Sequence, residues 1–176
     1  VYDSLPNSGH YILQLDIKSP KSVEKTAAEI KRRYGKLDIL VNSAGMTQPI
    51  PHADLEVLDE EVFNRFLHLN AGGPFSMIRR HMPLLKASGK SVVINVSSIS
   101  AFTGSGSNIA YCAAKGAIEA YSRAVAVHCG LAKNGVRCNT IHPSGIATPM
   151  VASVPALMAE KFGSSPVQDA PVDVNK

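Results

Sequence analysis

The stretch that decides the fold is Leu37-Asp-Ile-Leu-Val-Asn-Ser-Ala-Gly45. Positions 37–42 form a nearly continuous apolar run, and three small residues follow it. A short run of this kind predicts a strand that is buried on both faces, as the strands of a parallel sheet are. Such a sheet needs crossover helices on both sides of this strand in the sequence.

On the amino-terminal side, the chain carries a helix with well-marked ends. Ser19 followed by Pro20 is typical of an N-cap and a first helical residue, and Gly35 is typical of a helix end. The spacing predicts a helix over 20–34. Before it, Tyr11-Ile-Leu-Gln-Leu-Asp16 follows a Pro-Asn-Ser-Gly turn and predicts a short strand.

On the carboxyl-terminal side, helical and strand patterns alternate. Helical patterns cover Asp59–Leu69, Ala71–Leu85 and Asn108–Cys129, and strand patterns cover Ser91–Val96 and Val136–Ile141. This alternation predicts an α/β fold with a doubly wound parallel sheet. The length fits one domain over residues 1–176.

Three polar segments begin where predicted strands end: Asn42–Gly45, Ser97-Ser98 and His142–Gly145. The carboxyl ends of parallel strands meet at one edge of the sheet, and open α/β sheets bind their ligands there. We therefore expect one shared site at this edge.

A pair of side chains on the predicted helix over 108–129 suggests the chemistry of that site. Tyr111 and Lys115 lie one turn apart on one helix face. A free tyrosine has a pKa of about 10, and a nearby ammonium group lowers it, so the pair can act as a general acid/base. Ser98 can hydrogen-bond a substrate oxygen while Tyr111 exchanges a proton with it. Alone, these motifs are unspecific, because Tyr-x-x-x-Lys occurs by chance in many helices and serine is common in turns after strands.

In their order and spacing, the motifs over residues 11–150 resemble the short-chain dehydrogenase/reductase family. The matching segments are Asp16 after a strand, Asn42-Ser-Ala-Gly45, Asn70, Ile94-Asn-Val-Ser-Ser98, Tyr111-Cys-Ala-Ala-Lys115, Arg137-Cys-Asn-Thr-Ile-His-Pro143 and Thr148. The resemblance implies a Rossmann-like fold. It also implies an enzyme that interconverts a secondary alcohol and a ketone with NAD or NADP as the cofactor.

The resemblance implies four catalytic residues. Tyr111 would exchange the proton at the substrate oxygen, and Ser98 would orient the substrate. Lys115 would lower the pKa of Tyr111 and bind the nicotinamide ribose. Asn70 would hold a water that relays protons to Lys115. The plainer interpretation of Asn70 is a residue at a helix kink whose side chain bonds its own backbone.

The resemblance also implies which residues hold the cofactor, and it implies no metal site. The implied cofactor-binding residues are Asp16, Asn42, Ala44, Gly45, Tyr111, Lys115, Pro143, Ser144, Gly145, Ile146 and Thr148. For Asp16, a turn residue at a strand end is an equally plain interpretation.

The chain departs from the family pattern at three places. The family's first two strands, with the Gly-rich turn that receives the pyrophosphate, have no counterpart here, and neither does its last strand. Ser144 stands where the family has glycine. We therefore expect an incomplete Rossmann-like sheet. The alternative function is a catalytically silent truncated homologue that acts as an interaction or dimerisation module, and epimerase or lyase chemistry is a third option.

The carboxyl-terminal part suggests the kind of substrate. Residues after Thr148 are rich in Pro, Ser and Ala and predict a looser tail, within which 147–166 resembles the family's substrate lid. Val154, Leu157, Met158 and Phe162 are spaced for one apolar helix face, which suits a hydrophobic alcohol or ketone or simply packs onto the body. The motif His142-Pro-Ser-Gly-Ile-Ala-Thr-Pro-Met150 resembles certain bacterial hydroxysteroid dehydrogenases.

Composition narrows the remaining function classes. The net charge of +4 is small, and Lys31-Arg32-Arg33 suits a solvated helix face better than a nucleic-acid site. No apolar run reaches the roughly 18 residues of a membrane span, and three irregularly spaced cysteines favour reduced thiols and a cytoplasmic protein. The resemblance implies a homodimer or homotetramer through the helices around 70–85 and 108–129.

Overall fold

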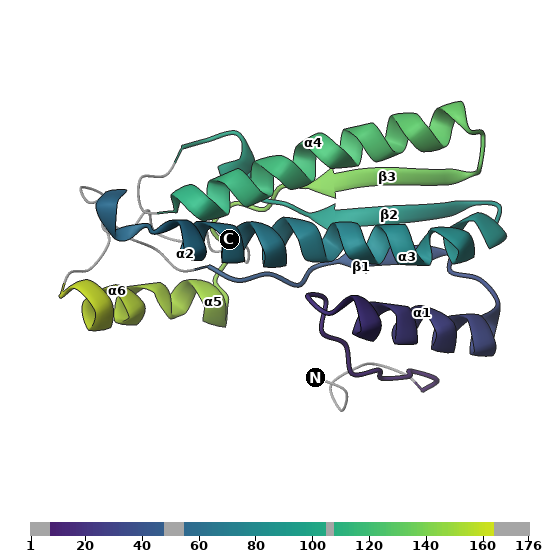
Figure 1. Cartoon of the computed structure of the whole chain (residues 1–176), viewed down its shortest axis with the longest axis horizontal. Coiled ribbons are helices and arrows are strands. Elements are labelled where there is room, and N and C mark those ends of the chain that lie inside the picture. The colour runs from purple at the N-terminus through teal and green to yellow at the C-terminus, as the bar shows by residue number, and fades with distance from the viewer. Residues whose placement is uncertain (1–7, 48–54, 105–107, 164–176) are drawn as a thin grey trace.

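Three parallel strands form the sheet of this protein. The computed structural model describes residues 8–47, 55–104 and 108–163. The strands β1 (Ile39–Asn42), β2 (Ser91–Val96) and β3 (Val136–Ile141) lie in that order. The register pairs Asn42 with Asn95 and Val96 with Ile141, so all three strands end at the same edge (Figure 1). The predicted α/β, Rossmann-like class is confirmed.

Helices precede and connect these strands, as parallel pairing requires. The long helices are α1 (Pro20–Tyr34), α3 (Gly73–Ala87) and α4 (Ile109–Leu131). Shorter ones are η2 (Leu55–Val57), α2 (Glu60–Leu67), η4 (Ile99–Ala101), α5 (Pro149–Ala152) and α6 (Val154–Phe162). None of the helices in the described ranges has the length and hydropathy that crossing a membrane requires.

Helix α1 forms where its local signals predict it. The Ser19 hydroxyl accepts a hydrogen bond from the Ser22 N–H at 3.3 Å, and Pro20 is the first helical residue. Gly35 ends the helix with φ 69°, and its N–H donates to the Lys31 carbonyl. The predicted helix over 20–34 is confirmed. It could be predicted because contacts between residues close in the sequence set both of its ends.

The hydrophobic core lies on the face of the sheet that α3 and α4 cover (Figure 1). Its buried members are Leu40, Val93, Val136 and Cys138 from the strands, Met77, Ile78 and Leu85 from α3, Val23 from α1 and Cys129 from α4. On the opposite face, Ile39 and Val41 are 59% and 56% exposed. The expectation that the strand at 37–42 is buried on both faces is therefore wrong for this chain, because α1 packs beside α3.

Two further predictions are corrected. Tyr11–Asp16 is not a strand. Strand hydrogen bonds need a neighbouring strand, and in the described part of the chain this segment pairs with none. Its Asp16 N–H instead donates to the Ser22 hydroxyl at 3.0 Å. The part of the tail from Pro149 to Phe162 is helical, since the Thr148 hydroxyl caps α5 by accepting from the Val151 N–H and proline follows at position 149. This Thr-Pro pair is the same start signal as Ser19-Pro20.

Candidate active site

The site begins where β2 ends and meets the first turns of α4. Ser98 is extended, with φ −166° and ψ 158°, and its side chain is almost buried. Its hydroxyl oxygen accepts from the Ser100 N–H at 3.1 Å, and the Ser98 side chain lowers the pKa of the nearby Tyr111 phenol. The structure thus brings together two of the four predicted catalytic side chains.

Lys115 lies beneath this pair and is 5% exposed. Its Nζ donates to the Val96 carbonyl at 2.8 Å and lies 5.3 Å from the centre of the Tyr111 ring. The Ser97 hydroxyl donates to the Lys115 carbonyl at 3.0 Å, which fixes this turn of α4 against the end of β2. Burial lowers the pKa of Lys115 to about 8, because the ammonium loses most of its hydration.

The pKa of Tyr111 differs from the sequence expectation. Burial raises it, and the hydrogen bond from Ser98 opposes that rise. The expected lowering by the Lys115 ammonium is not found in this structure, since that group faces the Val96 carbonyl. Tyr111 is therefore a protonated phenol at neutral pH.

Asn70 is fully buried in a π-helical segment, His68–Gly72, which joins α2 to α3. Its Oδ1 accepts from the Met46 N–H at 2.8 Å, and its Nδ2 donates to the Met46 carbonyl at 3.1 Å. Asn70 thus lies at a helix irregularity, and its side chain also hydrogen-bonds the loop after β1. A Cβ at Gly45 would lie 2.9 Å from Asn70 Oδ1 and 3.9 Å from Lys115 Nζ, so this backbone approaches both side chains closely.

The side chain of Asn42 points into the core. Its Nδ2 donates to Asn95 Oδ1 at 2.8 Å, and Asn95 Nδ2 donates to the Ser122 hydroxyl at 2.8 Å. Sequence reasoning missed this buried chain of hydrogen bonds. The signal for it was Asn95 at an inward position of an otherwise apolar strand.

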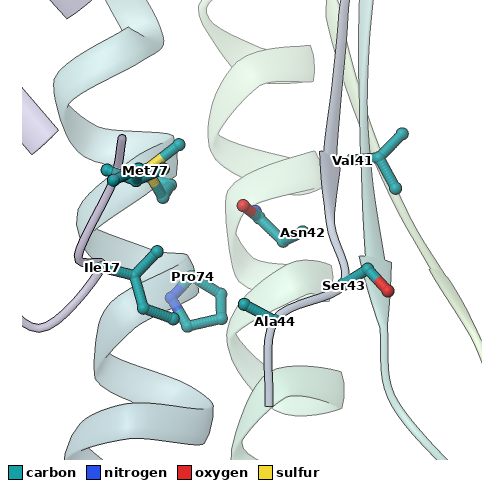
Figure 2. Close-up of a pocket in the computed structure, with 8 residues that line it drawn as sticks. Ile17, Val41, Asn42, Ser43, Ala44, Pro74 and Met77 are labelled. Atoms are coloured by element: carbon teal, nitrogen blue, oxygen red, sulfur yellow. The ribbon is translucent and has the colours of Figure 1, made fainter. Parts of the chain in front are cut away.

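A small cavity of about 90 Å³ lies beside the residues after β1. In Figure 2, Ile17, Pro74 and Met77 stand on one side, and the chain from Asn42 to Ala44 runs along the other. Its apolar wall and polar strand end suit one flat ring of a dinucleotide. Next to it, the exposed Asp16 carboxylate accepts from the Lys18 N–H at 2.9 Å, which is a turn contact.

The loop after β3 carries the remaining predicted cofactor residues. The Pro143 carbonyl accepts from the Ile99 N–H at 3.1 Å, which ties this loop to the segment after Ser98. Ser144 is exposed, while Gly145 and Ile146 are partly buried. The structure places Thr148 farther along, where its hydroxyl caps α5. Among the described residues, no group of three or more metal-ligating side chains is gathered.

Two residues near the site were not assigned a role from the sequence. His142 Nδ1 lies 3.0 Å from the Ser98 carbonyl, and Glu119 stands beside the His142 ring. The available signal was the spacing of Glu119, which lies one helical turn beyond Lys115.

Comparison with known proteins agrees with this geometry. Residues 3–174 match a family model described as enoyl-(acyl carrier protein) reductase. A 3-beta-hydroxysteroid dehydrogenase of Comamonas testosteroni is 36% identical over 141 residues, covering 80% of this chain and 54% of that protein. Levodione reductase superposes with a TM-score of 0.75 at 26% identity, covering 84% of this chain and 55% of its own.

A short-chain dehydrogenase from Streptomyces avermitilis superposes with a TM-score of 0.69 at 28% identity, covering 78% of this chain and 49% of its own. The chain spans about half the length of the curated relatives it matches. With the parallel sheet and the ordered motifs at its carboxyl edge, these similarities show that the chain belongs to the short-chain dehydrogenase/reductase family.

Proposed function

We propose that the protein is an NAD(P)-dependent oxidoreductase that interconverts a secondary alcohol and a ketone. The observation that carries this proposal is the gathering of three side chains at one place: Ser98 lowers the pKa of Tyr111, and the buried Lys115 Nζ lies 5.3 Å from the centre of the Tyr111 ring. A hydroxyl that orients a substrate oxygen and a phenol that exchanges its proton are the groups that this reaction needs.

Each side chain has one task in this proposal. Tyr111, protonated at neutral pH, donates its proton to the ketone oxygen during reduction and becomes the phenolate; in the reverse direction this phenolate removes the alcohol proton. Ser98 orients that oxygen, and the Lys115 ammonium supports the phenolate that forms. Asn70 holds a water that returns protons through Lys115. The cofactor, when bound, supplies or accepts the hydride.

The residues after β1 and β3 would hold NAD or NADP. Asn42–Gly45 borders the small cavity and approaches Lys115, and Pro143–Ile146 follows the end of β3. The cavity would accept one flat ring, and Gly45 has no Cβ that would crowd Asn70 and approach Lys115. In the same proposal, Asp16 and Thr148 would bind the two outer ends of the cofactor.

The substrate that fits best is hydrophobic. Ile99 and Phe102, which follow Ser98 directly, are 39% and 65% exposed. We assign 147–166 as a substrate lid, in which Val154 and Leu157 are partly buried. The side chains of Met158 and Phe162 lie outside the described residues.

A homodimer or homotetramer is part of the proposal. A groove of about 380 Å³ between α3 and α4 is lined mostly by apolar side chains, among them Phe75, Met82, Tyr121 and Val125. Phe75 is 46% exposed although its ring packs edge-on against Tyr121. An apolar strip of this kind is typical of a surface that a second copy covers. The three free thiols favour the cytoplasm as the compartment.

The function is tested by assaying the polypeptide, as its gene encodes it, against hydrophobic secondary alcohols with NAD and with NADP. We expect turnover with one cofactor and a loss of at least roughly a hundredfold in Lys115→Met. Lys21→Met, at an exposed site on α1, is the matched control and should keep full activity. A folded protein with no turnover on any of these alcohols or ketones would contradict the proposal.

A cofactor titration of the 176-residue chain, followed by nicotinamide fluorescence, tests the alternative function. Micromolar binding would exclude a catalytically silent interaction module.

A further inference from the structure

One stripe of α4 reaches the ends of both neighbouring strands. Tyr111, Lys115 and Glu119 follow each other at intervals of one helical turn, so they lie on one face. Tyr111 stands near Ser98, which lowers its pKa, and Lys115 Nζ donates to the Val96 carbonyl at the end of β2 at 2.8 Å. Glu119 continues the stripe to the end of β3, where its Oε2 accepts from the Thr140 hydroxyl at 2.6 Å.

His142 connects this stripe to Ser98. Its Nδ1 lies 3.0 Å from the Ser98 carbonyl oxygen, and its Nε2 lies 2.9 Å from Glu119 Oε2. A carbonyl oxygen only accepts, so Nδ1 carries a proton and donates it there. The ring therefore joins the backbone of Ser98 to the helix that holds Tyr111.

The surroundings hold the two ends of this connection in place. Arg123 Nη1 donates to the other oxygen of Glu119 at 2.6 Å. The pKa of Glu119 is lowered, first by the Thr140 hydrogen bond and then by His142 and Arg123, so the side chain is a carboxylate. The Phe102 ring packs on the His142 ring with centroids 4.5 Å apart. Both partners of the connection are mostly buried, with side-chain exposures of 20% for His142 and 13% for Glu119.

We propose that His142 is a positioning residue for Ser98. Through Glu119, it fixes the end of β2 relative to α4 and so sets the contact between the Ser98 and Tyr111 side chains. A misplacement of one ångström at a reacting group can cost about a hundredfold in rate. The inference rests on the proposed function, because that function gives the Ser98–Tyr111 contact its catalytic meaning.

The direct readout is the titration of Tyr111, which does not need turnover. Tyrosines labelled with ¹³C at Cζ are followed by NMR through alkaline pH, and the Tyr111 signal is assigned by its loss in Tyr111→Phe. Since the Ser98 hydrogen bond lowers the pKa of Tyr111, Ser98→Ala should raise it. His142→Phe, which keeps the ring contact with Phe102, should raise it as well.

Two other variants separate positioning from general damage. His142→Asn keeps an N–H near the Ser98 carbonyl and should restore part of the wild-type titration, even if the Phe variant does not fold. Glu119→Gln should also shift Tyr111 upward, whereas Glu61→Gln, on the exposed start of α2, should not. In the active polypeptide, His142→Phe should lower kcat by roughly tenfold to a hundredfold with the KM for the cofactor unchanged.

A His142→Phe titration equal to wild type, with a clear upward shift in Ser98→Ala, would overturn the inference. An unshifted Ser98→Ala would overturn it too, because the contact to be positioned would then be absent. If the polypeptide has no turnover at all, the proposed function fails, and the titration still decides whether His142 positions Ser98.

Discussion

At the scale of single residues, burial moves Tyr111 and Lys115 in opposite directions. It raises the pKa of the phenol and lowers that of the ammonium to about 8. In both cases burial removes water from the charged form and so favours the neutral form. The two side chains therefore remain a phenol and a cation at neutral pH. This state suits proton donation to a ketone oxygen.

The low pKa of Lys115 predicts a pH dependence of stability. The unfolded state keeps this proton up to about pH 10.5, while the native state loses it near pH 8, so the unfolded state binds more protons between these values. The contribution of Lys115 to the free energy of unfolding should therefore become more favourable as pH rises through this window. Relative to Lys115→Met, the wild type should gain about 1.5 kcal/mol between pH 8 and pH 9.5.

Chemical denaturation at a series of pH values measures this difference. Lys21→Met is the control, because its ammonium is exposed on α1. A constant difference between the wild type and Lys115→Met across this window would show that the ammonium is not desolvated.

At the scale of elements, the sequence predicted the helices and strands whose limits depend on residues close together in the chain. The limits of α1 follow from Ser19, Pro20 and Gly35, and β2 and β3 follow from the short strand patterns at 91–96 and 136–141. The supposed strand at 11–16 failed, because a strand depends on a neighbour that its own residues do not specify. A helix kink at Asn70 was one of the two interpretations, but the hydrogen bonds of its side chain to the Met46 backbone could not be predicted, since Met46 is distant in sequence.

The candidate site shows the same division. The ends of the predicted strands indicated that the segments after Asn42, Val96 and Ile141 would meet, because parallel strands share a carboxyl edge. The connection from His142 to Glu119 could not be predicted, since it depends on the side-chain rotamers of two elements. The inward direction of Asn42 likewise depends on Asn95, a partner on the neighbouring strand.

Two turns at the start of β2 and β3 give a prediction about these elements. Gly89 and Gly135 have nearly equal positive φ angles, 71° and 76°. A Cβ at Gly89 would meet open space, whereas one at Gly135 would overlap the Gly89 carbonyl oxygen. Gly89→Ala should cost only the left-handed strain of about 1 kcal/mol, and Gly135→Ala should cost at least about 2 kcal/mol more.

Thermal and urea unfolding of the two variants gives this comparison, in which each variant is the control for the other. Equal destabilisation would mean that the two turns do not touch as the structure has them.

At the scale of the whole molecule, the chain carries the residues that we propose for proton transfer, and it spans about half the length of its curated relatives. The described helices α3 and α4 cover the face of the sheet that supports this site (Figure 1). Side chains of the same two helices line the apolar groove. The subunit contact that we propose and the support of the candidate site would thus use the same two helices.

The groove predicts an effect on assembly. Phe75→Glu places a charge on the α3 side of it and should convert the oligomer to a monomer, measured by light scattering during size-exclusion chromatography. Leu55→Glu, at another exposed apolar position, is the matched control and should keep the wild-type mass. An unchanged mass in Phe75→Glu would place the contact surface elsewhere.

The central claim is that Tyr111 exchanges the proton at the substrate oxygen. Its most direct test is the turnover of Tyr111→Phe in the polypeptide as its gene encodes it, beside Tyr34→Phe, which removes a hydroxyl from an exposed residue at the end of α1. We expect a loss of at least roughly a hundredfold in kcat for Tyr111→Phe, with an unchanged fold, and no loss for Tyr34→Phe. Full activity in a folded Tyr111→Phe would contradict it.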